Sequence, residues 1–238
     1  MNKLAATWAH QSELKQASGD LDASGKASVQ AYALRRSMIE KDSSNRIWQR
    51  NLYAAELRLI ETNSTGQSPN EVLSRLDKLH QNISELSSLE PKKLALQVLI
   101  ANVQKKKASI YLQQRQHAKA IEALVPSLDK LQHLYKSNSN DISIRNTLVD
   151  ALLLNADLNS ARAGERAELA CQAVLLMLKP FLNGSADFQV LAPWVKASAC
   201  LGQLDSTTES QMRLEAMSYR DPAYLSYIST HPLKKGSL

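Results

Sequence analysis

The sequence predicts an all-α chain arranged as an array of helix pairs, and three observations carry that prediction. Leucine occurs 37 times and alanine 29 times in the 238 residues, against 9 valines and 10 isoleucines. Leucine and alanine favour helices, whereas β-branched and aromatic residues favour strands. Glycine and proline, seven of each, separate amphipathic segments at regular intervals. Single hydrophobic cores stop growing at about 250–300 residues, and helix bundles are usually smaller than that. A chain of this length is therefore more consistent with a repeating array of helices than with one bundle.

The positions of the helix-breaking residues predict eleven helices in a single domain over residues 1–238. The helices are grouped as five antiparallel pairs and a closing helix. Successive pairs start near residues 2, 46, 92, 141 and 187. The helices are expected at about 2–17, 20–42, 46–62, 69–88, 92–115, 117–137, 141–161, 165–182, 187–201, 205–217 and 221–229. The pairs therefore occupy about 2–42, 46–88, 92–137, 141–182 and 187–217, and the cap is 221–229.

Helix boundaries in the first half follow from local chemistry. Gly19 permits a tight turn between the first two helices, and Asn45 can cap the third helix with its short polar side chain. Ser68 occupies a cap position followed by Pro69 in the first helical turn. Glu90 precedes a proline and so avoids the α region, which predicts a helix boundary there.

Residues that end helices also occur at intervals in the second half of the chain. Breaks are expected at residues 138–141, at Gly164, at 183–185, at Gly202 and at 221–222. Pro126 lies inside the sixth helix, where it removes a backbone donor and clashes with an earlier carbonyl, so we expect a kink.

Apolar residues recur at helical spacing in several of these segments. We expect one buried stripe in each of three helices: Ile47, Leu52, Ala55 and Leu59 in the third; Val72, Leu76, Leu79, Ile83 and Leu86 in the fourth; Leu124, Leu128, Leu131 and Leu134 in the sixth.

Residues 19–52 carry a more specific pattern. Gly19-Asp20-Leu21 opens a helix with Ala31-Tyr32 in its middle, and residues 42–52 read Asp-Ser-Ser-Asn-Arg-Ile-Trp-Gln-Arg-Asn-Leu. This stretch resembles the long variant of the tetratricopeptide repeat (TPR) that is common in bacteria. The resemblance implies a right-handed α-solenoid of about five TPR-like helix pairs, longer than the roughly 34 residues of a minimal unit. Trp48 and Tyr32 are expected to supply large buried area where successive pairs stack.

The C-terminal part, with Pro193-Trp194 and residues 219–225, resembles the last unit of repeat arrays in bacterial Ser/Thr kinases, and similar arrays occur in winged-helix regulators. Such arrays are protein-interaction scaffolds. The resemblance therefore implies a non-catalytic sensory or protein-binding module of a larger signalling protein. Because solenoid ends need a polar capping repeat and residue 1 is almost immediately helical, we expect a natural N-terminal part before it. The alternative is a small protein whose first helix starts early. The domain is expected in the cytoplasm by default, and in the periplasm if it is the distal part of a membrane-anchored protein.

Catalytic and cofactor motifs are missing from the sequence. The five histidines are scattered, and no phosphate-binding glycine loop or Gly-x-Ser-x-Gly element occurs. We therefore expect no enzyme activity, no metal site and no cofactor. No run of roughly 18 apolar residues occurs either, so we expect no membrane insertion by this segment. Cys171 and Cys200 can be read either as two buried free thiols or as a disulfide between neighbouring helices.

Charge is concentrated in the first half of the chain, which has 18 basic and 11 acidic residues over 1–119. Residues 91–121 hold seven basic residues and no acidic one, which suggests as an alternative a nucleic-acid-associated regulator using a basic face over 92–119. Only Tyr111 among aromatic residues falls in that stretch, which disfavours nucleic acid. Three consecutive lysines cover about 200° of a helix, so one must lie beside the apolar stripe, and we assign that place to Lys106.

The expected partner is a protein or peptide held on the concave face, which the first helix of each pair lines in arrays of this kind. Polar residues on those helices are the candidate contacts: Arg50, Asn51, Arg58, Asn102, Lys106, Asn146, Asp150 and Asn155. Asn155 stands inside an apolar run, so its side chain needs a hydrogen-bond partner. A neighbouring loop would serve as well as a ligand, and we favour the structural role.

Overall fold

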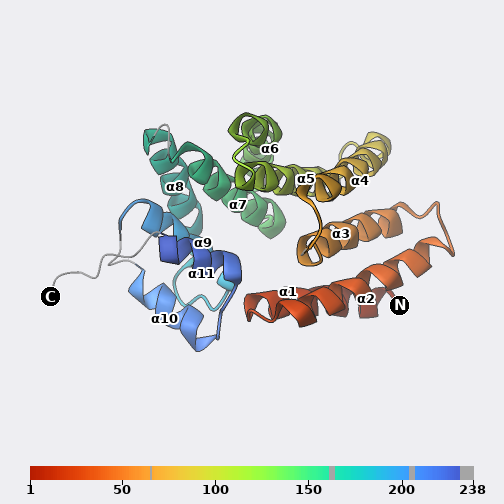
Figure 1. The fold of residues 1–238 in the computed structure, drawn as a ribbon, viewed down its shortest axis with the longest axis horizontal. Coiled ribbons are helices and arrows are strands. Elements are labelled where there is room, and N and C mark those ends of the chain that lie inside the picture. Colours follow the sequence, from red (N-terminus) through yellow and green to blue (C-terminus); the bar gives the residue numbers. More distant parts are fainter. Residues whose placement is uncertain (65, 161–163, 204–206, 231–238) are drawn as a thin grey trace. The chain divides into compact units, whose positions relative to one another are not determined.

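The computed structural model of the chain describes residues 1–64, 66–160, 164–203 and 207–230. Over these residues the regular structure is entirely helical, with eleven α-helices, one short 3₁₀ helix and no strand. The helices form two compact units, Met1–Ile110 and Tyr111–Leu238. Within each unit most of the contacts between helices join neighbours in the chain, and α9 also contacts α7 and α11 (Figure 1).

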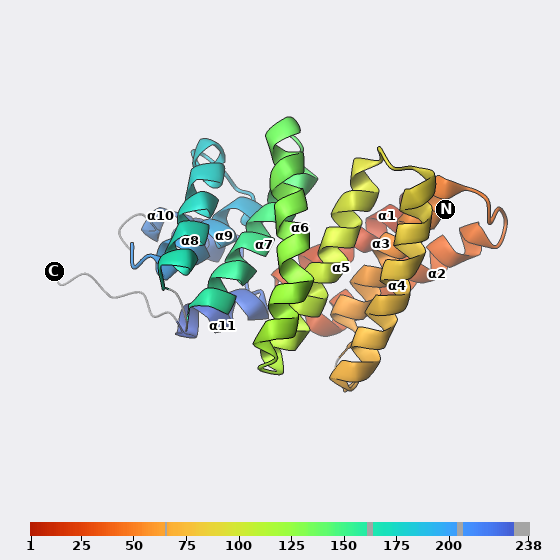
Figure 2. The same cartoon turned by 90° about the horizontal axis from the view of Figure 1, so that it is seen from above.

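Unit 1 contains α1 (Asn2–Ala17), α2 (Leu21–Ile39), α3 (Arg46–Thr62), α4 (Pro69–Leu89) and most of α5 (Leu94–Gln113). Helix α1 contacts α2, α2 contacts α3 and α3 contacts α4. Unit 2 contains α6 (His117–Ser137), α7 (Ile142–Asn159), α8 (Gly164–Leu178), the 3₁₀ helix η1 (Lys179–Phe181), α9 (Phe188–Cys200), α10 (Thr208–Ala216) and α11 (Pro222–Thr230). Helix α7 contacts α6, α8 and α9, so it lies at the centre of unit 2 (Figure 2).

Each predicted helix is present, with ends that differ by a few residues. The largest difference is in α8, which ends at Leu178 rather than 182. Pro180 follows within η1, because proline cannot donate the backbone hydrogen bond that would continue the α-helix. Pro126 lies inside α6, which runs unbroken from His117 to Ser137.

The buried faces confirm two of the three predicted stripes. All of the predicted leucines, valine and isoleucine of α4 and α6 are buried. The stripe predicted for α3 is confirmed at Ala55 and wrong at its other three positions, because Ile47 is exposed and Leu52 and Leu59 are only half-buried. The residues that α3 buries are Ala55, Leu57 and Ile60. Trp48 and Tyr32 are half-buried as well.

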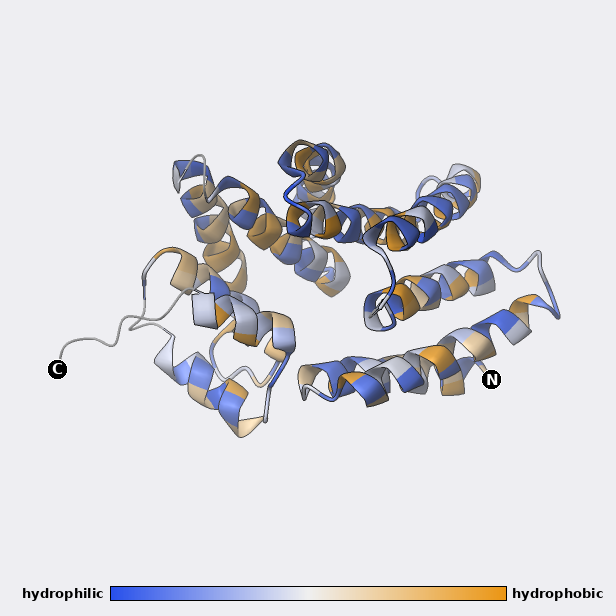
Figure 3. Ribbon diagram, in the orientation of Figure 1, coloured by the Kyte–Doolittle hydropathy of each residue, from blue (hydrophilic) through white to orange (hydrophobic). Residues whose placement is uncertain are grey.

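The seam between α1, α2 and α3 is built from small side chains rather than large ones. Ser12 and Ser24 are both buried, their hydroxyls lie 3.2 Å apart, and Ser24 Oγ donates to the carbonyl oxygen of Ser12 at 2.8 Å. Small residues allow close backbone approach, and each buried hydroxyl here has its hydrogen bond. Hydropathy along the ribbon is accordingly mixed in α1 and α2, whereas apolar residues recur through α8 (Figure 3).

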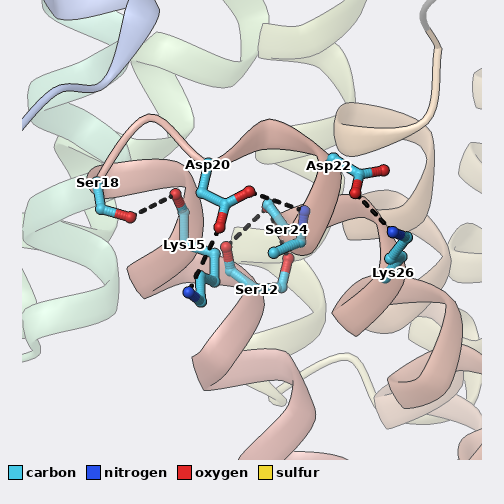
Figure 4. Close-up of polar contacts among 8 residues, drawn as sticks. Ser12, Lys15, Ser18, Asp20, Asp22, Ser24 and Lys26 are labelled. Atoms are coloured by element: carbon cyan, nitrogen blue, oxygen red, sulfur yellow. Dashed lines mark hydrogen bonds and ion pairs between the residues drawn. The ribbon is translucent and has the colours of Figure 1, made fainter.

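Asparagine and aspartate side chains cap helices where the sequence predicts a break. Asn45 accepts from the backbone N–H of Trp48 at 3.1 Å, as expected, and Asp141 does the same for Ile144 at 3.0 Å. At the first turn, the Asp20 carboxylate caps α2 and also pairs with the Lys15 ammonium at 3.4 Å (Figure 4). Ser68 and Glu71 form the reciprocal capping box of α4.

A disulfide joins α8 to α9 through Cys171 and Cys200, whose Cα atoms are 6.4 Å apart. This settles the two alternatives for these cysteines, and the reading as free thiols is wrong. Nearby, α9 provides Leu191 and Val195 to a core cluster that includes Leu214 of α10 and Tyr224 of α11. The C-terminal helices are thus held to α9 by apolar contacts, and α9 is held to α8 by a covalent bond.

Candidate binding grooves

Unit 2 carries a groove between α7, α9 and the turn before α11, which we call the polar groove. Its volume is about 290 Å³. Its lining residues are Asn146, Asp150, Leu153, Phe188, Gln189, Ala192, Pro193, Lys196, Tyr219 and Asp221. The polar side chains among these residues are two amides, two carboxylates, one ammonium and one phenol.

The α7 wall of the polar groove contains two of the predicted contact residues. Asn146 and Asp150 are four residues apart and therefore share one face of the helix. The Asn146 amide is held on both sides: Oδ1 accepts from Arg145 Nε at 3.1 Å, and Nδ2 donates to Gln189 Oε1 of α9 at 2.8 Å. An asparagine amide can make four hydrogen bonds, so the fixed group retains capacity for a ligand.

Arg145 is itself held in place. It is buried, and its guanidinium lies 4.1 Å from the centroid of the Phe181 ring, a cation–π contact. Because Arg145 is packed in this way, the Asn146 amide that accepts from it has a defined orientation.

The aromatic wall of the groove is set by a tight turn between α10 and α11. Ser218 takes φ +54°, and Tyr219 donates its backbone N–H to Leu214 at 2.9 Å. This directs the Tyr219 ring against Phe188, with centroids 5.5 Å apart, and edge-on against Tyr224 at 5.2 Å. The wall is therefore formed by the stacked rings of Phe188 and Tyr219, and the edge-on contact with Tyr224 helps to fix the Tyr219 ring.

The electrostatics of this wall keep its phenol neutral. Burial raises the pKa of Tyr219 above its usual value, and the negative charges of Asp221 and Asp150 raise that pKa further. Tyr219 therefore stays protonated near neutral pH. Lys196 lies on the same groove, with its Nζ 5.6 Å from the Tyr227 ring centroid. Among the described residues, the lining side chains offer hydrogen-bond donors, hydrogen-bond acceptors and charges of both signs for polar recognition.

A second groove, which we call the apolar groove, lies over α7 between α6 and α8. Its volume is about 370 Å³. Its lining residues are Ile121, Val125, Leu128 and Gln132 of α6, Leu152, Asn155 and Asn159 of α7, and Arg166, Leu169, Ala170 and Ala173 of α8. Here the predicted contact residue Asn155 accepts a hydrogen bond at Oδ1 from Asn159 Nδ2, 3.1 Å away. A neighbouring side chain of its own helix therefore satisfies part of its polar group.

The other five predicted contact residues belong to α3 and α5 and line neither groove. Arg58 has a structural role, because its Nε and Nη2 donate to Ser12 Oγ and to the Ser12 carbonyl oxygen at 3.1 and 3.0 Å. Arg50, Asn51, Asn102 and Lys106 are half-buried. Of the three consecutive lysines, Lys107 is the one that pairs with α4, at 2.6 Å from Asp77 Oδ1.

Sequence reasoning did not single out Phe188, Gln189, Lys196 or Asp221 as contact residues. Asp221 caps α11 by accepting from the Tyr224 N–H at 3.0 Å, and Asp187 caps α9 in the same way. In the sequence, these two aspartates therefore indicate the start of a helix and not a binding site. The contact of α9 with α7 places Phe188, Gln189 and Lys196 beside the α7 residues of the groove, and the contact of α9 with α11 places Asp221 there.

Three general findings complete the description. Among the described residues, no helix is both long and apolar enough to cross a bilayer. Within the same residues, no three histidine, cysteine, aspartate or glutamate side chains gather as metal ligands would. The chain matches no family model, no curated protein and no solved structure in the comparisons made with each.

Proposed function

We propose that the chain is a non-catalytic protein-interaction module of the TPR-like class, a right-handed solenoid of helix pairs that binds a protein or peptide segment in the polar groove. In a larger bacterial signalling protein it would act as a sensory or scaffolding region. The observation that carries the proposal is the groove shared by α7 and α9, the first helices of the fourth and fifth predicted pairs. In helical repeats of this kind, such successive first helices form the binding surface.

The chemistry of the groove suits an extended peptide. Peptide N–H and C=O groups need acceptors and donors, and the fixed Asn146 amide supplies both. Asp150 and Lys196 offer charges of both signs for side chains of the peptide, and the Phe188–Tyr219 stack offers an apolar surface. Of the eight predicted contacts, Asn146 and Asp150 are the two that we retain for this groove.

The test is a selection of linear peptides on the full chain from a random phage-displayed library, followed by calorimetric titration of the selected peptides. We expect the Asn146→Ala/Asp150→Ala double variant to raise the Kd at least roughly tenfold, or about 1.4 kcal/mol. Asn102→Ala is the matched control, because Asn102 is a half-buried asparagine that lines neither groove. Its Kd should stay within about twofold of the parent. Failure to select any peptide, or equal loss in both variants, would contradict the proposal.

The nucleic-acid alternative gains no support from the basic stretch. Lys107 is paired with Asp77, and Lys119 lies 5.8 Å from the Tyr111 ring centroid, so two of the seven basic residues have partners within the chain. We therefore do not propose nucleic acid as the partner.

A further inference from the structure

The apolar groove has two facing walls of exposed hydrophobic side chains. On α6, Ile121 and Val125 are four residues apart and keep 36% and 39% of their surface exposed. On α8, Leu169 keeps 57%, and Ala173 follows one turn later. Single exposed hydrophobic residues are normal on protein surfaces, but a contiguous apolar groove marks an interaction site.

The spacing of these side chains fits a helix better than a strand. Residues at i and i+4 form ridges along both α6 and α8, and a helix laid between them can insert its own ridge of side chains. An extended segment would need partners for its backbone N–H and C=O groups. The described residues of the lining supply few such partners, since only Gln132, Asn155, Asn159 and Arg166 among them are polar. A helix, by contrast, satisfies its own backbone.

Two of those polar groups indicate the charge of the occupant. Arg166 is the one charged side chain among the described residues of the lining. It is exposed, and it forms no ion pair with any of the described residues. Asn155 uses Oδ1 to accept from Asn159, which leaves its Nδ2 without an acceptor among those residues. Both groups are donors, and a carboxylate is the acceptor that Arg recognises best.

We propose that the apolar groove is a docking surface for an amphipathic α-helix of a partner protein. The apolar face of that helix lies between Ile121 and Val125 on one side and Leu169 on the other. A glutamate or aspartate at the edge of that face meets Arg166 and Asn155. This surface is separate from the polar groove and does not depend on the peptide-binding function proposed above.

The test uses the full chain and a displayed library of amphipathic helices of about 16 residues, roughly four turns. The apolar face is randomised among hydrophobic residues, and the edge position is fixed as glutamate in one half of the library and lysine in the other. We expect enrichment from the glutamate half. In anisotropy titrations of the enriched peptides, Leu169→Glu should raise the Kd at least roughly tenfold, as for an apolar hot spot, and Arg166→Glu should shift the preference to lysine peptides.

Leu176→Glu is the matched control, because Leu176 is also an exposed leucine of α8, at 73%, but lies outside the groove. Its Kd should stay within about twofold of the parent. Circular dichroism would confirm that both variants keep their helix content. The proposal is overturned if no helix is enriched, or if Leu169→Glu and Leu176→Glu weaken binding equally. Loss of binding with Asn146→Ala/Asp150→Ala instead would place the helix in the polar groove. Self-association that Leu169→Glu abolishes would make a second copy of the chain the occupant.

Discussion

Two residues occupy backbone conformations that the chain elsewhere gives to glycine. Gly19 and Gly202 follow the ends of α1 and α9 with φ +82° and +65°. In each turn the backbone N–H groups of the glycine and of the next residue donate to carbonyl oxygens in the last turn of the preceding helix. Arg115 and Ser218 end α5 and α10 with the same hydrogen bonds, at φ +59° and +54°. A side chain in this left-handed region costs roughly 1–2 kcal/mol. At Ser218 that cost accompanies the turn that places Tyr219 in the polar groove.

Replacing Ser218 by glycine should therefore stabilise the protein. Relief of the left-handed strain is offset in part by the greater freedom of glycine in the unfolded chain, so we expect a gain of about 0.5–1 kcal/mol. Urea denaturation of the full chain measures it. Gly202→Ala is the control and should have the opposite sign, because it introduces a Cβ at φ +65°. A loss of stability in Ser218→Gly would show that the serine side chain contributes more than its backbone strain costs.

Gly25 and Asn63 should be coupled in the free energy of unfolding. A Cβ on Gly25 of α2 would overlap Asn63 Oδ1, and Asn63 Nδ2 also donates to the Gly25 carbonyl oxygen at 3.4 Å. We expect Gly25→Ala alone to destabilise, because Asn63 must move and lose its bond. In an Asn63→Ala background the same change should stabilise by about 0.5–1 kcal/mol, the usual helix gain of alanine over glycine. A double-mutant cycle by urea denaturation tests this, and additive effects would contradict the coupling.

Helices were predictable where large apolar residues made the period visible. The leucine stripes of α4 and α6 are buried as expected, and the caps Asn45 and Ser68 carry the predicted hydrogen bonds. The face of α3 was predicted correctly only at Ala55. Apolar residues lie on several sides of this helix, so the pattern alone does not decide which of them face the core. The structure buries Leu57 and Ile60 and leaves Ile47 exposed in the first turn.

At the level of α4, we expect a pH dependence of stability centred on His80. Burial lowers the pKa of His80, the positive charge of Lys107 lowers that pKa further, and Asp77 opposes both. The folded protein thus binds a proton at His80 less readily than the unfolded chain does. As pH falls below the usual value of about 6.5, the unfolded state takes up that proton first, so the free energy of unfolding decreases.

Urea midpoints measured between about pH 7.5 and 5.5 would show this decrease. In His80→Gln the part of the slope that comes from His80 should vanish, because glutamine does not titrate. The expectation fails if the variant keeps the full slope of the parent.

Across the whole molecule, the candidate contact residues come from segments that only the tertiary structure brings together. Asn146 and Asp150 were predictable because they share a face of a first helix. Tyr219 and Asp221 reach the same groove only through the left-handed turn at Ser218, and Gln189 through the contact of α7 with α9. The most specific sequence pattern, over residues 19–52, belongs to unit 1, whereas both grooves belong to unit 2. The segment with the most specific local pattern is therefore not the segment that carries the two grooves.

The division into two units predicts a local response to reduction of the disulfide. The bond joins residues 29 apart, and a loop of that length stabilises by about 3–4 kcal/mol in the chain-entropy model. Because both cysteines lie in unit 2, reduction should lower the hydrogen-exchange protection of α8 and α9 and leave that of α1 to α4 unchanged. Exchange measured by mass spectrometry with and without dithiothreitol would resolve the two units.

A Cys171→Ala/Cys200→Ala variant serves as the control, since its exchange should resemble that of the reduced protein and should not respond to dithiothreitol. Equal loss of protection in α1 to α4 would mean that the two units unfold as one cooperative body. In that case the disulfide would stabilise the chain as a whole, because opening of unit 2 would then require opening of unit 1.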